Sequence, residues 1–181
     1  IHKKFGVDPD IAIYGKALGN GYAITAVVGR ASIMEAAQKT FISSTFWTER
    51  IGPSAALKTL EIMERKKSWL QITTLGKKIK KKWLEIAKNN NIKIDTWGID
   101  AMPGFSFKSK NNNIYKTYIT QEMLKKRILA SNNIYCSIAH NEKMFRNYFT
   151  FLDKIFNKIY KFENDHLDPR SFLEGPESIT G

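Results

Sequence analysis

The fold of this chain is decided by the stretch DIAIYGKALGNGYAITAVVGR, which spans residues 10–30. A short apolar run ends at a single lysine, Lys16, and a glycine-rich turn leads to a second apolar run. Both runs are rich in β-branched residues and bounded by glycine or proline, which predicts short buried strands over residues 11–14 and 24–29. An amine at the end of a buried strand is shielded from water and stays partly neutral, as a Schiff-base lysine must.

Neither of two common phosphate-binding motifs accounts for this lysine. A Walker loop has its glycines before the lysine and a Ser or Thr after it. Here the glycines follow Lys16, and Ala17 stands where the hydroxyl belongs. The dinucleotide fingerprint Gly-x-Gly-x-x-Gly also fails, because the order here is Gly-x-x-x-Gly-x-Gly. Taken alone, the motif leaves open a plain lysine on a solvated turn.

The composition indicates a globular protein, with 43% hydrophobic and 12% aromatic residues. The formal net charge of +12 keeps a basic nucleic-acid-binding protein open as an alternative. However, many lysines lie in helix-like stretches such as residues 77–82, where Leu75, Ile79 and Trp83 recur every fourth position. These lysines are expected to form a solvated helix face, so no nucleic-acid partner is expected. The asparagine runs at residues 89–91 and 111–113 indicate compositional bias.

Other classes of protein are excluded by what the sequence does not contain. No apolar run approaches the roughly 20 residues of a membrane span, so no membrane association is expected. The single cysteine, Cys136, permits no disulfide framework and no paired-cysteine metal site. No metal is expected, and a reducing cytoplasm fits best. The chain opens on Ile1 rather than methionine, which suggests a fragment of a longer protein.

The remaining elements follow from periodicity and capping residues. A helix with Ser32 as N-cap is expected within residues 30–39, followed by a loop over residues 41–48. A long helical pattern begins at Pro53, is split near Lys67–Ser68, and ends at the asparagines of residues 89–91. The second half is expected to form a small α+β layer. Its elements are strands over 92–97, 104–108 and 134–138, a helix over 118–129 capped near Thr120, a helix over 141–162, and a loop over 163–181.

Residues 6–30 resemble the cofactor-lysine segment of class III aminotransferases, which are fold type I pyridoxal-phosphate enzymes. In that family a strand ends in a lysine within a GKALGGG or GKIIGGG pattern, and an apolar strand with Gly-Arg follows. This chain has GKALGNG at residues 15–21 and VVGR at residues 27–30. The resemblance implies that Lys16 is the catalytic lysine and holds pyridoxal 5'-phosphate as an internal aldimine.

Two further segments are similar to the same family. Ser44-Thr45-Phe46 resembles its Ser-Thr-Tyr or Gly-Thr-Leu segment, which implies that Thr45 binds the cofactor phosphate of the neighbouring subunit. Taken alone, Thr45 would be a loop hydroxyl that bonds nearby backbone. Residues 124–142 resemble the LLDEGVYL…SAAHTEED region of the glutamate-1-semialdehyde aminomutase branch, which makes His140 a junction or capping residue rather than a base. Departures are the sequence WTER at 47–50 and Arg127, where the family has a small residue.

The resemblance implies an α/β, fold type I architecture in three parts. Residues 1–52 would end the mostly parallel sheet of the large domain, residues 53–88 would form the interdomain helix region, and residues 89–181 would form the small C-terminal α+β domain. The implied activity transfers an amino group between an amino donor and a carbonyl substrate through a lysine-bound aldimine. The alternatives are an aminomutase that moves the amino group within one molecule, and an inactive fragment that serves as an interaction domain. A homodimer with a shared active site is implied, and the isolated chain is expected to be inactive.

Overall fold

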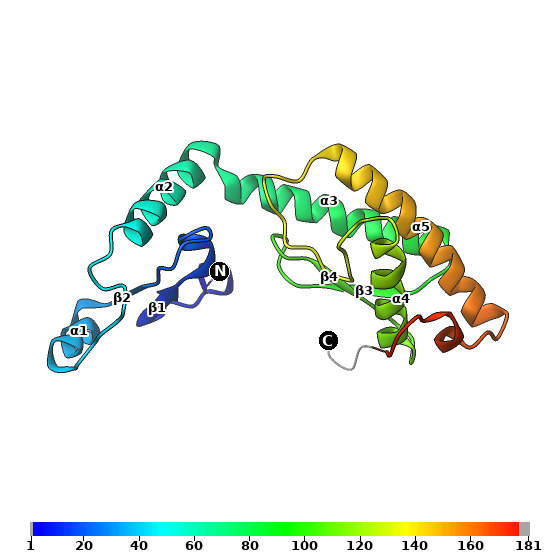
Figure 1. Cartoon of the computed structure of the whole chain (residues 1–181), viewed down its shortest axis with the longest axis horizontal. Coiled ribbons are helices and arrows are strands. Elements are labelled where there is room, and N and C mark those ends of the chain that lie inside the picture. Colours follow the sequence, from blue (N-terminus) through cyan, green and yellow to red (C-terminus); the bar gives the residue numbers. More distant parts are fainter. Residues whose placement is uncertain (1, 178–181) are drawn as a thin grey trace. The chain divides into compact units, whose positions relative to one another are not determined.

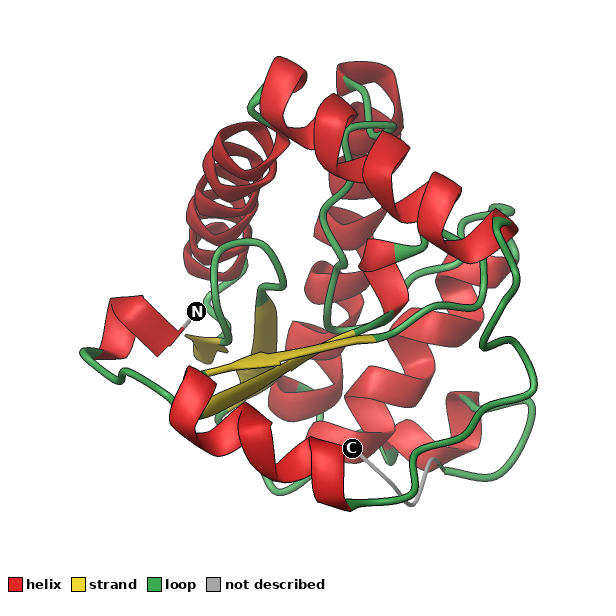
Figure 2. Ribbon diagram, turned by 90° about the vertical axis from the view of Figure 1, so that its left-hand side faces the viewer, coloured by secondary structure: helices red, strands yellow, loops and turns green. Residues whose placement is uncertain are grey.

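The computed structural model describes residues 2–177, and the chain folds as two compact units, residues 1–67 and residues 68–181 (Figure 1). Figure 2 shows that helices and loops make up most of the chain and that the strands are few and short. Among the described residues, no helix is long and apolar enough to cross a membrane. The first unit contains, in order, η1 (His2–Phe5), β1 (Ile11–Tyr14), η2 (Lys16–Leu18), β2 (Ala26–Gly29), α1 (Ala31–Met34), η3 (Glu35–Lys39) and α2 (Ile51–Lys66).

The strands β1 and β2 form an antiparallel two-stranded sheet, with Ile13 opposite Val27 and Tyr14 opposite Ala26. β1 begins and ends as predicted, whereas β2 starts two residues later than expected. The prediction that both strands are buried is wrong, since three of the four residues of each strand are exposed. Strands that are apolar along their whole length need other elements packed on both faces of their sheet, and unit 1 provides such packing on neither face of the β1–β2 sheet.

The rest of unit 1 has little regular structure before α2. The predicted helix of residues 30–39 is present as α1 and η3, but its N-cap is Arg30 and no side chain caps it, so the Ser32 cap is wrong. Residues 41–48 form the predicted loop. α2 has Pro53 in its first turn, as expected, and ends at Lys67, whose φ of +48° is left-handed. The predicted split near Lys67–Ser68 is therefore confirmed.

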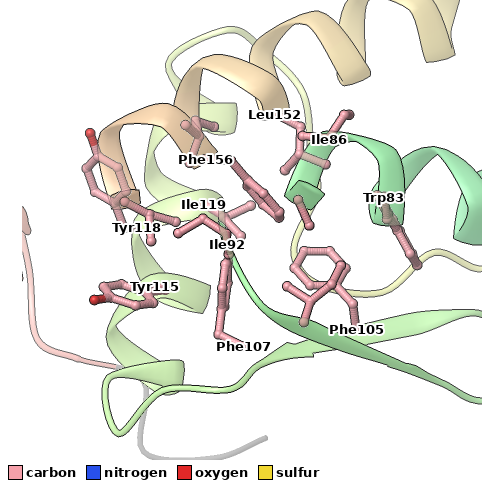
Figure 3. Close-up of a cluster of buried hydrophobic side chains, with 14 of the residues drawn as sticks. Trp83, Ile86, Ile92, Phe105, Phe107, Tyr115, Tyr118, Ile119, Leu152 and Phe156 are labelled. Carbon is pink, nitrogen blue, oxygen red and sulfur yellow. The ribbon is translucent and has the colours of Figure 1, made fainter. Parts of the chain in front are cut away.

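The second unit packs three helices on one face of a second antiparallel sheet. It contains α3 (Ser68–Asn89), β3 (Ile94–Trp97), β4 (Gly104–Phe107), α4 (Asn112–Leu124), α5 (Glu142–Asn164) and η4 (Pro169–Phe172). The sheet turns Ile94, Phe105 and Phe107 inward and leaves Asp95 and Trp97 exposed. The core residues come from all three helices and both strands (Figure 3).

Aromatic contacts organise this core. The Trp83 ring on α3 lies 4.9 Å from that of Phe105, edge to face, and Phe105 is 5.7 Å from Phe156 on α5. Trp83 donates a 2.9 Å hydrogen bond from Nε1 to the hydroxyl of Tyr148, and both side chains are buried. Burial raises the pKa of the Tyr148 hydroxyl, which the Trp83 hydrogen bond only partly offsets. Edge-to-face pairs and a satisfied polar pair make this a well-specified core.

Three elements of the second unit differ from the sequence prediction. One is the loop predicted over residues 163–181, because α5 extends to Asn164 and Pro169–Phe172 form η4; residues 178–181 lie outside the described part of the chain. The helix predicted over 118–129 is α4, which starts six residues earlier; Thr120 lies inside it and donates its hydroxyl to the Lys116 carbonyl rather than capping the helix. The helix ends early because Arg127 is left-handed, with φ of +58°, and Ile128 N bonds the Met123 carbonyl.

The predicted strand over residues 134–138 is wrong. Ile134 N and Cys136 N donate to the carbonyls of Pro103 and Ala101, so this segment bonds a loop. Pro103 has no N–H with which to continue a ladder, and only an isolated bridge between Gly104 and Asn133 forms.

Candidate cofactor site

Lys16 is separated from the end of β1 by Gly15 and lies on a tight turn that its backbone helps to close. Asn20 N donates to the Lys16 carbonyl at 3.2 Å, and Leu18 N donates to the Gly15 carbonyl at 3.1 Å. Lys16 has φ of +49°, a left-handed conformation that residues with a Cβ adopt rarely. Such strained backbone clusters at functional sites, so this turn is a candidate site.

Gly19 is required by close contacts, and the space around Gly15 is tight. A Cβ on Gly19 would lie 2.1 Å from the Tyr22 carbonyl oxygen and 2.8 Å from the Ile24 side chain. A Cβ on Gly15 would lie 3.3 Å from the Thr25 side chain. The loop therefore folds directly onto the start of the next segment, and this fixes where the Lys16 backbone lies.

The Lys16 side chain is exposed. The expectation that it is shielded at the end of a buried strand is therefore wrong for this chain, because β1 and β2 are themselves uncovered. Among residues 2–177 its amine has no hydrogen-bond or ion-pair partner, so it is available to react with a carbonyl group.

An ion-pair cluster holds the other end of the hairpin. The Arg30 guanidinium contacts the Asp8 carboxylate at 3.2 Å and the Asp10 carboxylate at 3.1 Å, and Arg30 N bonds the Asp10 carbonyl. Sequence reasoning missed this cluster, although two aspartates before one strand and an arginine after its partner would have indicated it. All three side chains are exposed, so each pair stabilises the hairpin only modestly.

Thr45 lies on the exposed loop before α2, at the start of a turn over residues 45–48. Two backbone amides of this turn bond Ser44: Phe46 N donates to its hydroxyl and Trp47 N donates to its carbonyl. In the described part of the chain the Thr45 hydroxyl has no hydrogen-bond partner, and no bond joins it to Lys16. The loop alternative, in which this hydroxyl bonds nearby backbone, is not observed.

These residues suit a phosphorylated aldehyde. A free amine on a fixed backbone can bond an aldehyde carbon, and a free hydroxyl on a loop can donate to a phosphate. In the part of the chain that the structure describes, no three His, Cys, Asp or Glu side chains gather to hold a metal ion.

His140 belongs to unit 2, whereas the turns that carry Lys16 and Thr45 belong to unit 1. Its Nδ1 accepts from Ser137 N at 3.3 Å and its ring lies edge to face with Phe145, while Asn141 caps α5 by accepting from Met144 N. His140 therefore lies at a loop-to-helix junction and not at the expected strand-to-helix junction, and the cap of α5 is its neighbour Asn141. It lines a mainly apolar cavity of about 480 Å³ that sequence reasoning missed, together with Ile128, Ile134, Phe145 and Tyr148.

The chain matches the family model of class III aminotransferases over residues 1–145. The chain belongs to the class III aminotransferase family. It is 34% identical over 140 residues to the 3-aminobutyryl-CoA aminotransferase of Cloacimonas acidaminovorans, covering 77% of this chain and 33% of that enzyme. It is also 30% identical over 100 residues to the 4-aminobutyrate aminotransferase GabT of Escherichia coli, covering 55% of this chain and 24% of GabT. The chain thus spans about a third or less of these curated relatives.

Solved structures agree on the fold. The FumI protein of Sphingopyxis sp. MTA144, in its PLP internal aldimine form, matches 94% of this chain and 42% of its own with a TM-score of 0.81 and 21% identity. An S-selective transaminase from Arthrobacter sp. matches 90% of this chain and 41% of its own, with a TM-score of 0.73 and 20% identity. The chain therefore has the architecture of part of a fold type I enzyme, and the cofactor of its family is pyridoxal phosphate.

Proposed function

We propose that this chain carries the catalytic lysine of a pyridoxal-phosphate-dependent aminotransferase, and that this lysine is Lys16. The position of Lys16 supports the proposal above all. Lys16 is the residue held on the glycine turn after β1, its amine has no partner among the described residues, and it lies inside the family match. The reaction moves an amino group from an amino donor to a carbonyl acceptor.

In this proposal the Lys16 amine has two roles, as a nucleophile and as a group that transfers a proton. When bound, pyridoxal phosphate supplies an aldehyde carbon and a ring that withdraws electrons from the substrate. As the free amine, Lys16 Nζ would bond the aldehyde carbon of the cofactor, and a water molecule would leave. With the cofactor and substrate bound, the freed Nζ would take a proton from the substrate carbon that carries the amine and hold it for return to the reacting molecule. The backbone hydrogen bonds of residues 15–20 would hold the Lys16 backbone in one position on the turn during these steps.

Thr45 is proposed to bind the cofactor phosphate of a neighbouring subunit in a homodimer. Its hydroxyl is exposed and without a partner in the described chain, and nothing joins it to Lys16 within one protomer. A site that takes Lys16 from one subunit and Thr45 from the other is consistent with both facts.

A cytoplasmic location is proposed on the lone cysteine, Cys136, which has no partner for a disulfide.

Transamination is favoured over an aminomutase reaction because the curated relatives described above are aminotransferases. The two differ in product. A transaminase releases a carbonyl product and passes the nitrogen to a second molecule, whereas an aminomutase returns the nitrogen to the adjacent carbon of the same molecule. A donor labelled with ¹⁵N separates these outcomes.

The test uses a fusion of this chain to the part of the Cloacimonas enzyme that lies outside their match. Visible absorbance is recorded with pyridoxal phosphate, and transfer of ¹⁵N to a carbonyl acceptor is followed by mass spectrometry. The wild type and Lys39→Ala, a change at another exposed lysine of unit 1, are expected to show both signals. Lys16→Ala is expected to show neither. Equal absorbance and transfer in Lys16→Ala would overturn the proposal.

A further inference from the structure

The turn after Lys16 contains the one Asn-Gly pair of the sequence, Asn20-Gly21. Asn20 stands where the GKALGGG pattern has a glycine, so the pair is a departure of this chain from that pattern. Asparagine is among the chemically labile residues. The backbone nitrogen of the next residue can attack its side-chain amide, and glycine hinders this attack least because it has no Cβ. The surroundings of the two residues decide whether the reaction can occur in the folded chain.

The peptide unit between Asn20 and Gly21 is held by no hydrogen bond. Among the described residues, Gly21 N has no acceptor and the Asn20 carbonyl has no donor. The Asn20 side chain is exposed and has no hydrogen-bond partner in the same part of the chain. Gly21 has φ of +108°, and no atom lies within 4 Å of the place that its Cβ would occupy. The peptide unit can therefore rotate and bring Gly21 N to Asn20 Cγ without breaking a hydrogen bond of its own.

Asn91 offers a comparison within the same chain. It is also exposed and left-handed, with φ of +54° against +48° for Asn20. However, the nitrogen that follows it, Ile92 N, donates to the Ala87 carbonyl at 2.8 Å, and Ile92 is a buried, β-branched residue. Attack by Ile92 N would break this bond and bring a branched side chain against the reacting amide. The two asparagines share backbone conformation and exposure, and they differ in the freedom of the attacking nitrogen.

We propose that Asn20 is a site of spontaneous modification in the folded chain, at which it becomes aspartate and isoaspartate. Gly21 N bonds Asn20 Cγ, the bond from Cγ to Nδ2 breaks, and ammonia leaves with the proton of Gly21 N. The product is a cyclic imide, a succinimide. Water then adds to one of the two ring carbonyls and breaks its bond to the nitrogen, which gives aspartate or isoaspartate. The proposal does not depend on the proposed amino transfer.

The conversion would change the turn that carries Lys16. Tyr22 N bonds the Gly19 carbonyl at 3.1 Å across Asn20 and Gly21, and Asn20 N bonds the Lys16 carbonyl at 3.2 Å. Isoaspartate carries the chain through its Cβ, which lengthens the backbone between Gly19 and Tyr22 by a methylene group. Both products also place a negative charge where a neutral amide stood.

The experiment incubates the 181-residue chain in mildly alkaline buffer, in which the attacking nitrogen loses its proton more readily. Samples taken over time are digested, and peptide mass spectrometry measures the deamidated fraction at Asn20 and at Asn91. Electron-transfer fragmentation separates isoaspartate from aspartate. A synthetic peptide of residues 15–26 gives the rate at Asn20 without the fold. The variant Gly21→Ala keeps Asn20 and adds a methyl group beside the attacking nitrogen.

Asn20 is expected to convert several-fold faster than Asn91 and at a rate close to that of the peptide. Isoaspartate should appear, because direct hydrolysis of the amide yields aspartate alone. Gly21→Ala is expected to slow conversion at Asn20 several-fold and to leave Asn91 unchanged, and the wild-type comparisons stand without this variant. The proposal is overturned by conversion at Asn20 that is no faster than at Asn91, far slower than in the peptide, or unchanged in Gly21→Ala. Aspartate without isoaspartate would overturn it as well.

Discussion

Gly76 lies on α3 where the helix meets the loop between β3 and β4, and its replacement by alanine gives a test in which two effects have opposite signs. In the interior of a helix, alanine is favoured over glycine by about 1 kcal/mol. At this position, however, a Cβ would lie 1.5 Å from the Asp100 carbonyl oxygen, a backbone atom that no rotamer change can move. The helix and the loop would have to separate.

The separation would also break bonds made one turn further along α3. Lys80 donates to the Gly98 carbonyl at 2.7 Å and pairs with the Asp100 carboxylate at 3.2 Å, with both charged side chains about four-fifths buried. Overpacking costs about 1–3 kcal/mol, and loss of the Lys80 hydrogen bond costs about 1 kcal/mol more. After subtracting the alanine preference, Gly76→Ala is expected to lower the free energy of unfolding by about 1–3 kcal/mol.

Urea unfolding followed by far-ultraviolet circular dichroism measures this change, with an unchanged slope showing that the same surface is exposed. Thr74→Ala is the control, because Thr74 is exposed on the same helix; it is expected to stabilise α3 by a few tenths of a kcal/mol. A Gly76→Ala protein stabilised by about 1 kcal/mol would show that helix preference alone operates there, and would refute the close approach of the loop.

Three other predictions concern unit 2. Tyr148→Phe is expected to lower the free energy of unfolding by about 1–3 kcal/mol in urea titrations, because Trp83 Nε1–H would be buried without its acceptor; an unchanged midpoint would argue against the bond. Arg127→Gly is expected to raise the free energy of unfolding by about 0.5–1 kcal/mol, because glycine relieves the strain of the left-handed backbone at this position. A lower thermal midpoint would contradict this prediction. Burial raises the pKa of Tyr115, Tyr118 and Tyr148 above the unfolded value of about 10, so the unfolded state loses these protons at a lower pH than the folded state does. The free energy of unfolding should therefore be at its full value below about pH 10 and should fall as the pH rises above it. Urea midpoints that stay constant from about pH 9 to pH 11 would show that these hydroxyls titrate normally in the folded state.

Local patterns were enough to locate most elements. The apolar alternation around Ile94 and Phe105 identified β3 and β4, and the apolar stripe on α5 identified that helix to within two residues at its end. The start of α4 was missed because the asparagines at residues 111–113, which form its N-cap and its first two positions, were attributed to compositional bias. In the structure, Asn112 Oδ1 accepts a 2.8 Å bond from Phe107 N, so this asparagine ties the strand end to the helix start. A side-chain bond between neighbouring elements has no periodic signature.

Features that depend on distant segments could not be predicted from local sequence. The segment after α4 has the composition of a strand, but its partner is a loop containing Pro103, which cannot return the hydrogen bonds. The position of Lys16 after β1 was predicted correctly, and its exposure was not. Whether a short apolar strand is buried depends on which other elements pack against it, and the sequences of β1 and β2 do not show this.

The central claim is that Lys16 is the lysine that bonds the cofactor, and its most direct test is chemical trapping on the chain itself. The chain is incubated with pyridoxal phosphate and reduced with borohydride, and the modified fraction of every lysine is measured by peptide mass spectrometry. Lys16 is predicted to be modified several-fold more than Lys39, another exposed lysine of unit 1, because the hydrogen-bonded turn of residues 15–20 fixes the Lys16 backbone. Equal modification of Lys16 and Lys39 would contradict the account.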